Sequence, residues 1–228
     1  MTSRVYRRAL LALLGLAPSG ILGAQVAGLP VRNAGIGTGI GVAVDAGFPN
    51  GAAGKGWAIG ATGMVGLGPF GVTASVSHWK PKGLESLNSV GATGNFKILG
   101  GPLIPLSVTL QAGAGYSKVT QQGIEAPVTT KTVHVPVGIG VALTIPNPVF
   151  SIKPWIAPRL DVVRVTIKSD TPAETSTDKR FAISGGVDLG FLSGFSVRVM
   201  YDRTTTGDEG ATRHPSILSI GVGLKVGL

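Results

Sequence analysis

The last eleven residues alternate strictly between two kinds of side chain. Aliphatic residues occupy every second position: Leu218, Ile220, Val222, Leu224, Val226 and Leu228. The positions between them are small or polar: Ser219, Gly221, Gly223, Lys225 and Gly227. Because successive side chains of an extended strand point to opposite faces, this period of two predicts a β-strand with one purely apolar face. Such a face must contact either a protein core or lipid.

The composition favours lipid as that contact. Charged residues make up 14% of the chain, whereas soluble domains average about 25%, and glycine accounts for 36 of the 228 residues. No stretch after the N-terminal region reaches the roughly 18 apolar residues of a membrane helix, so a membrane form must be a closed barrel, which pairs every backbone group. The alternative is a soluble secreted sandwich or lipocalin-like barrel. Its solvated face would then be Gly, Ala, Ser and Thr, where charged residues are usual.

The N-terminus has the layout of a secretory signal peptide. Arg4, Arg7 and Arg8 precede a short apolar run over residues 9–17, and small residues follow up to Ala24. We therefore predict cleavage near Ala24, which would carry the mature chain out of the cytoplasm. A short N-terminal helix in a cytosolic protein is the alternative.

The alternation recurs along most of the chain. We predict strands at residues 34–48, 55–68, 70–79, 88–99, 104–119, 131–145, 149–168, 180–191, 194–203 and 218–228. Four connections are short and five are long and polar, as ten antiparallel strands require when both ends of the chain lie on the short-turn side. The prediction is an all-β, closed, up-and-down transmembrane barrel over residues 34–228, with an eight-stranded variant, a signal peptide at 1–24 and a short periplasmic segment at 25–33.

Three positions depart from the regular pattern. The apolar parity slips at Val163, which predicts a β-bulge in that strand. Trp79 and Trp155 fall on the inward parity, where a large indole is unexpected, and a local bulge would turn either one outward. The bulges predicted at these three positions can be tested directly against the structure.

Aromatic residues cluster near the predicted strand ends. The long-loop group is Phe48, Trp57, Tyr116, Phe181 and Tyr201. The short-turn group is Phe70, Phe96, Phe150, Phe191 and Phe195. Two such groups are typical of the aromatic girdles at the two membrane interfaces.

Together, the signal peptide, the alternating strands, the turn asymmetry and the terminal strand resemble the small Gram-negative outer-membrane β-barrel proteins over residues 34–228. The resemblance implies an outer-membrane location, with periplasmic turns and extracellular loops. It also implies insertion by the barrel-assembly machinery, which reads the C-terminal strand. Such proteins usually end in an aromatic residue, whereas this chain ends in Leu228.

Inward-facing ionisable residues are the candidates for a functional lumen. They are Asp45, Lys97, Lys153, Arg159, Asp161, Asp188, Arg198, Asp202 and Lys225. Asp188 and Arg198 lie almost opposite each other across a short turn, and Arg159 and Asp161 share one face. Paired charges that fill a polar lumen are one interpretation, because buried charges are tolerated only with partners. A selective polar path is the other.

The sequence contains few residues that could form a catalytic or cofactor-binding site. The chain has three histidines and no cysteine, and the histidines are too far apart for a zinc site, so we expect neither metal nor cofactor. His134, inward near the long-loop rim, is the one candidate for a rim hydrolase acting on lipid or peptide. The glycine repeats lack phosphate-loop spacing, and the sparse, scattered charge argues against nucleic acid.

The long loops carry a modest basic excess. The basic residues are Lys55, Lys80, Lys82, Lys118, Lys131, Lys168, Lys179, Arg180, Arg203 and Arg213. The acidic residues are Glu85, Glu125, Asp170, Glu174, Asp178, Asp208 and Glu209. This rim suits the anionic phosphates of outer-membrane lipids, although ordinary loop solvation explains it equally well. The sequence thus predicts a non-catalytic structural or surface-interaction protein, with a narrow passive channel and a rim hydrolase as alternatives.

Overall fold

A computed structural model describes residues 25–101, 104–122, 127–169, 172–205 and 214–227. The predicted signal peptide, residues 1–24, lies outside this part of the chain. No helix among the described residues is long and apolar enough to cross a membrane.

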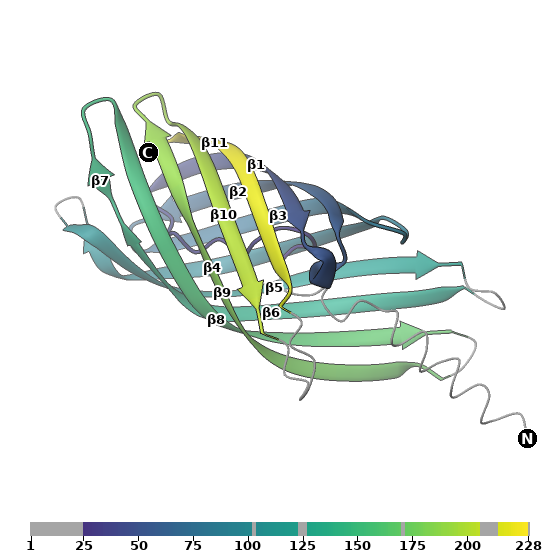
Figure 1. Cartoon of the computed structure of the whole chain (residues 1–228). Helices are drawn as coiled ribbons and strands as arrows, with labels where there is room; N and C mark the ends of the chain where they lie inside the picture. The colour runs from purple at the N-terminus through teal and green to yellow at the C-terminus, as the bar shows by residue number, and fades with distance from the viewer. Residues whose placement is uncertain (1–24, 102–103, 123–126, 170–171, 206–213, 228) are drawn as a thin grey trace, which may run out of the picture.

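The described residues form one closed antiparallel sheet (Figure 1). Its strands are β1 (Gly39–Pro49), β2 (Gly56–Leu67), β3 (Phe70–Pro81), β4 (Leu87–Gly101), β5 (Ile104–Gln121), β6 (Val128–Leu143), β7 (Ile145–Pro146), β8 (Phe150–Lys168), β9 (Glu174–Phe191), β10 (Phe195–Thr204) and β11 (Ser216–Val226), with a 3-10 turn η1 (Gly51–Ala53) after β1. Consecutive strands pair, β1 pairs with β11, and β6 pairs with β8. The two-residue β7 only prolongs the path of β6 beside β8, so ten long strands close the barrel, as predicted.

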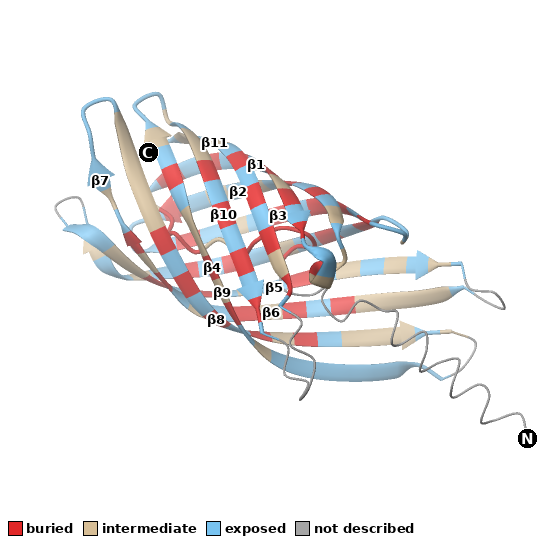
Figure 2. Cartoon of the chain, viewed as in Figure 1, coloured by how far each residue is buried: buried red, intermediate tan, exposed pale blue. Residues whose placement is uncertain are grey.

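The apolar face of the sheet points outward. Along β1, Ile40, Val42 and Val44 are 47–59% exposed, while the residues between them are buried. The terminal strand β11 repeats this alternation, with Ser219 fully buried. Figure 2 shows the resulting checkerboard of exposed and buried residues. A continuous apolar exterior of this extent suits hydrocarbon rather than water, and the 11 residues of β1 match the roughly 9–11 that a tilted strand needs to cross a bilayer.

Four neighbouring strands are longer than the rest and project at the long-loop end (Figure 1). β5, β6, β8 and β9 have 16–19 residues, compared with 10 in β10. We call their projecting part the extension; it comprises residues 118–121, 128–132, 164–168 and 174–180. Within the described residues, β10 pairs with β9 only as far as Ala182, so the projecting part of β9 has its strand partner on the β8 side.

The bulge predicted at Val163 is not present. β8 and β9 stay in register from residue 150 to residue 167, and Val163 is buried on the same parity as Asp161. The apolar parity changes because β8 enters the extension, where its outward side chains become polar, as at Arg164. Register shifts occur instead in β4, between Lys97 and Gly101.

The N-terminal boundary of the barrel also differs from the prediction. β1 begins at Gly39 rather than at residue 34. Residues 25–33, expected in the periplasm, lie inside the barrel together with residues 34–36. The alternation does continue into this stretch, but Ile36 packs against Gly71 on the inner wall instead of facing outward. A strand pattern alone does not distinguish an apolar side chain facing lipid from one that fills a lumen.

Candidate functional site

The lumen contains residues 25–38, an irregular stretch that we call the lumen segment. It is anchored at the long-loop end by β3 and β4. The hydroxyl of Ser77 donates to the carbonyl oxygen of Ala27 (2.8 Å), and the Ala27 N–H donates to the hydroxyl of Ser89 (2.8 Å). At its other end, the carbonyl of Gly37 lies against Gly66 near the short turns. The lumen segment therefore runs along the barrel and then reverses into β1.

Side chains of two wall strands, β5 and β9, hold the middle of the lumen segment. Ser184 on β9 donates its hydroxyl to the Val31 carbonyl (2.7 Å), and Gln111 on β5 donates its amide to the Arg32 carbonyl (3.0 Å). Asn33 donates to the Thr109 carbonyl on β5 (3.4 Å). Because β6 and β8 separate these two strands, the lumen segment is attached to the wall at more than one place.

The glycines of the inner wall make room for this backbone. A Cβ atom at Gly47, Gly115 or Gly140 would overlap a carbonyl oxygen of the lumen segment. These three glycines belong to three different strands, β1, β5 and β6. Part of the glycine content is thus explained by close backbone approach inside the barrel.

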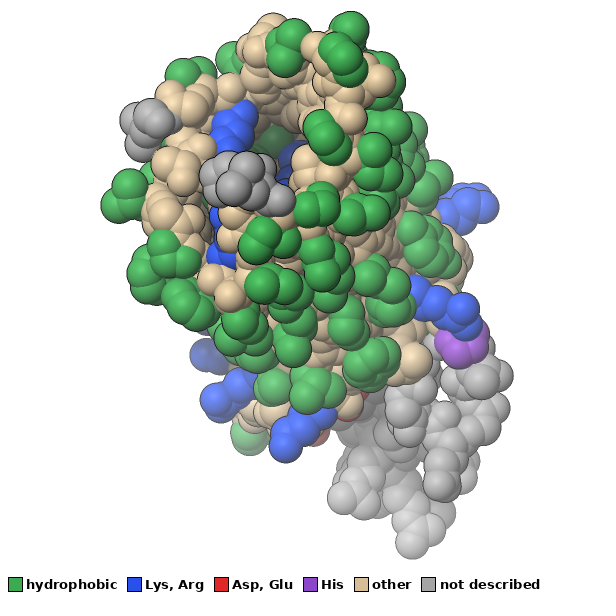
Figure 3. All heavy atoms as spheres, turned by 90° about the vertical axis from the view of Figure 1, so that its left-hand side faces the viewer, with side chains coloured by type: hydrophobic (Ala, Val, Ile, Leu, Met, Phe, Trp, Pro, Cys, Tyr) green, Lys and Arg blue, Asp and Glu red, His purple; other side chains and the backbone are tan. Residues whose placement is uncertain are grey.

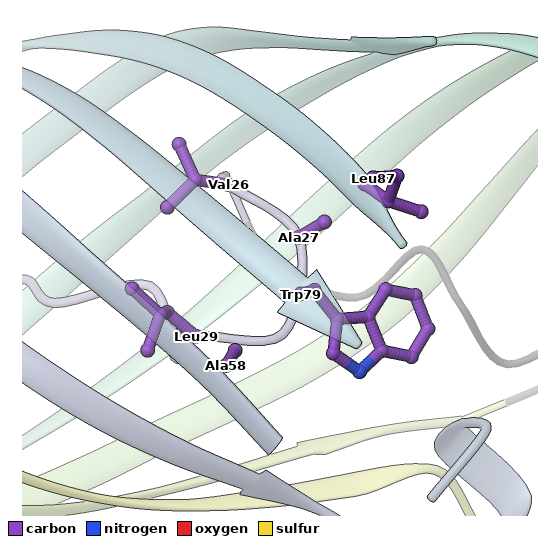
Figure 4. Close-up of a cluster of buried hydrophobic side chains, with 6 residues drawn as sticks. All are labelled: Val26, Ala27, Leu29, Ala58, Trp79 and Leu87. Atoms are coloured by element: carbon purple, nitrogen blue, oxygen red, sulfur yellow. The ribbon is translucent and has the colours of Figure 1, made fainter. Parts of the chain in front are cut away.

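The two inward tryptophans pack against the lumen segment. Trp79 is 1% exposed and lies in a cluster with Val26, Ala27 and Leu29 of the lumen segment, together with wall residues (Figure 4). Trp155, 5% exposed, packs in a second cluster that includes Ala34. No bulge turns either indole outward; both supply the apolar wall that the buried side chains of the lumen segment require.

Charged pairs fill the middle of the lumen. The guanidinium of Arg159 contacts Asp161 (Nε to Oδ1, 2.9 Å) and Asp202 (Nη1 to Oδ2, 2.7 Å). His134 Nε2 lies 3.2 Å from the same Asp161 oxygen. All four side chains are at most 4% exposed. The Arg159–Asp161 neighbourhood inferred from their spacing is therefore present, and Asp202 from β10 completes it.

The remaining acidic residues pair differently from the sequence expectation. Asp188 and Arg198 are indeed register partners on β9 and β10. Arg198, however, binds Asp45 on β1 (Nε to Oδ1, 2.6 Å), and Asp188 binds Arg32 of the lumen segment. Arg32 was absent from the predicted set because its segment was placed outside the barrel.

Three predicted lumen residues collect at the short-turn end. Lys97, Lys153 and Lys225 are partly exposed there, and they make no ion pair within the described residues. Lys153 and Lys225 line an open cavity of about 460 Å³ together with Arg32 and Asp188. Figure 3 looks into this end of the barrel and shows Lys and Arg side chains inside the opening, within a rim of hydrophobic and other residues. The lumen is thus filled in its middle and open and cationic at the short-turn mouth.

The predicted catalytic candidate has no access to a substrate in this arrangement. His134 does have a carboxylate neighbour, Asp161, but its side chain is only 4% exposed within the filled lumen. His78 lies on the outer surface, with Nδ1 2.8 Å from the Asn88 amide oxygen. Among the described residues, no group of three or more His, Asp or Glu side chains is arranged to hold a metal ion.

The predicted interfacial aromatics lie on the outer face of the barrel. Phe181 is not near a strand end, because β9 begins at Glu174 and not at residue 180. At the short-turn end, Phe70 stacks on Phe96 (ring centroids 5.2 Å apart) and Phe191 on Phe195 (5.9 Å). At the long-loop end, Phe48 and Tyr201 both sit beside Leu218 of β11. Phe150 pairs with Phe191, while Trp57, Tyr116 and Phe181 are 42–49% exposed.

Comparisons with known proteins bear on the fold alone. No family model matches the chain, and no curated protein matches its sequence. Among solved structures, it is similar to the transport unit of the autotransporter AIDA-I from Escherichia coli (TM-score 0.47, 13% identity, covering 95% of this chain and 97% of that one). It is also similar to the outer-membrane protease OmpT from Escherichia coli (TM-score 0.44, 11% identity, 83% and 94%) and to Neisserial surface protein A (TM-score 0.41, 14% identity, 83% and 98%). Likenesses this weak transfer no role to this chain, whose barrel is established by its own closed register.

Proposed function

We propose that this chain is an outer-membrane β-barrel with a closed lumen, acting as a structural or surface-interaction protein without catalysis. The observation that carries the proposal is the filling of the lumen by residues 25–38. Hydrogen bonds from β3, β4, β5 and β9 hold that segment, and apolar contacts to two buried tryptophans reinforce it. If the signal peptide is removed near Ala24, this segment becomes the N-terminus of the mature protein.

The filled lumen weighs against the two alternatives. A passive channel needs a continuous aqueous path, and barrels of this strand number generally pack their interior. The cavity beside Gln25 and Arg32 is only about 50 Å³. A rim hydrolase needs a reachable base, whereas His134 is enclosed.

The extension supports a role at the cell surface. On the expected orientation it projects outside the cell, and it carries Lys118, Lys131, Lys168 and Lys179 against Glu174 and Asp178. We propose that these lysines contact phosphates of anionic outer-membrane lipids, and that β11 engages the barrel-assembly machinery during insertion. Native mass spectrometry that counts retained phosphatidylglycerol tests the lipid contact. Changing the four lysines to Gln should lower that count, and an unchanged count contradicts the contact.

Planar-bilayer recording tests the closed lumen. The protein as described should give no conductance steps, because residues 25–38 occupy the path. A variant lacking residues 25–36 should conduct, since the glycine-lined wall would then enclose open space. Heat-modifiable migration on a gel must show that both proteins are folded. Steady conductance by the full-length barrel would contradict the proposal.

A further inference from the structure

The short-turn mouth of the lumen concentrates positive charge. We define the basic mouth as the cavity of about 460 Å³ lined by Arg32, Lys153 and Lys225, with Lys97 of β4 partly exposed at the same end of the barrel. Among the described residues, Asp188 is the carboxylate that lines this cavity, and it binds Arg32. Arg198 also lines the cavity, and its guanidinium binds Asp45. None of the three lysines makes an ion pair within the described residues, although Asp188 is the register partner of Lys153.

The strands place the backbones of these lysines at the wall of the cavity. The ammonium of Lys225 lies against Gly37, where a Cβ atom would come within 2.8 Å of Nζ. Lys153 is the register partner of Asp188 on β9, which holds its backbone at the cavity wall. Lys153 and Lys225 thus come together at one cavity from β8 and β11.

The basic mouth also presents hydrogen-bond donors. Arg32 contributes a partly buried guanidinium to the cavity lining, where it also binds Asp188. The hydroxyls of Ser151 and Ser196 line the same cavity and make only long bonds of 3.4 Å to backbone carbonyls. These donors surround a volume in the range of ordinary small-molecule sites.

From this convergence we propose that the basic mouth binds a small, multiply charged phosphate compound. Lysine ammonium groups bind phosphate as point charges, and a polyphosphate has the charge density to relieve repulsion among three of them. The cavity is open at the short-turn end and closed on the inside by the lumen segment, so the ligand binds there without crossing the barrel. This inference does not depend on the proposed surface role.

The test is calorimetric titration of inorganic pyrophosphate into the refolded full-length chain in phosphatidylcholine nanodiscs. Saturable binding that weakens with added NaCl is expected. The Lys153→Gln/Lys225→Gln variant should bind about tenfold or more weakly, because it loses two charge-assisted contacts. The matched Lys80→Gln/Lys82→Gln variant removes the same charge from the exposed long-loop end and should bind as the parent does. Absence of binding, or equal weakening in both variants, overturns the site.

Two further arms identify the ligand class. Citrate, a tricarboxylate, should bind more weakly than pyrophosphate; equal or tighter binding overturns the phosphate assignment. Nanodiscs that also contain phosphatidylglycerol separate a soluble phosphate from a lipid headgroup. A soluble ligand binds equally in both lipid mixtures, whereas competition by phosphatidylglycerol overturns the soluble-ligand proposal. Heat-modifiable migration confirms that each variant is folded before it is titrated.

Discussion

The middle of the lumen and its short-turn mouth differ in how their inward-facing charges are compensated. In the middle, every charge described here has a partner: Arg159 lies between Asp161 and Asp202, and all three are nearly inaccessible to water. At the mouth, Lys153 and Lys225 are partly exposed and have no ion pair among the described residues. The difference follows from solvation, because an enclosed charge needs a protein partner while a charge at an opening can keep its water.

We expect charges in the middle of the lumen to matter for the stability of the fold, and charges at the mouth to matter for ligand binding. A buried network loses stability when one member is removed, since the remaining charges stay enclosed without compensation. A group of like charges at an opening adds nothing to stability and retains its capacity to attract an opposite charge. The middle of the lumen is therefore where substitutions should unfold the barrel, and the mouth is where they should change binding.

The largest expected effect is at the centre of the network. Arg159→Leu leaves Asp161 and Asp202 buried beside each other without their cation, which should lower the free energy of unfolding by about 3–5 kcal/mol. Guanidinium titration of the protein in liposomes, followed by heat-modifiable migration, measures the loss. Lys153→Gln at the mouth is the control and should change stability by less than about 0.5 kcal/mol. Similar losses in the two variants would show that the middle and the mouth do not differ as described.

Most features of the barrel wall could be predicted from the amino-acid sequence. The strand pattern, the ten-strand count and the outward apolar face all follow from a period of two, which each strand carries within itself. The inward parity of Asp45, Arg159, Asp161 and Asp202 follows from the same rule. Wall positions are predictable because they depend on local alternation and on the contrast between lipid and lumen.

The contents of the lumen were not predictable from that rule. Residues 25–38 have no period of their own that distinguishes them from a strand or a linker, and their contacts join positions up to 171 residues apart, as between Val31 and Asp202. One signal was present, however. Trp79 and Trp155 on the inward parity require apolar neighbours inside the barrel, and inward glycines leave space for backbone. Large indoles opposite glycines on an inner wall therefore indicate that a segment of chain fills the lumen.

A smaller effect is expected at Trp79, and it tests whether the inward tryptophans pack against the lumen segment. Trp79→Phe trims a buried indole that packs on Val26 and Leu29, and should cost about 1–2 kcal/mol of unfolding free energy. Trp57→Phe, on the lipid-facing side, is the matched control and should cost less, because its side chain is 47% exposed within the protein. In the variant lacking residues 25–36, the Trp79→Phe substitution should lose most of its effect, since the packing partners are gone; this coupling is what a double-mutant cycle measures. An undiminished cost in that variant would mean that the wall, and not the lumen segment, holds Trp79 inside.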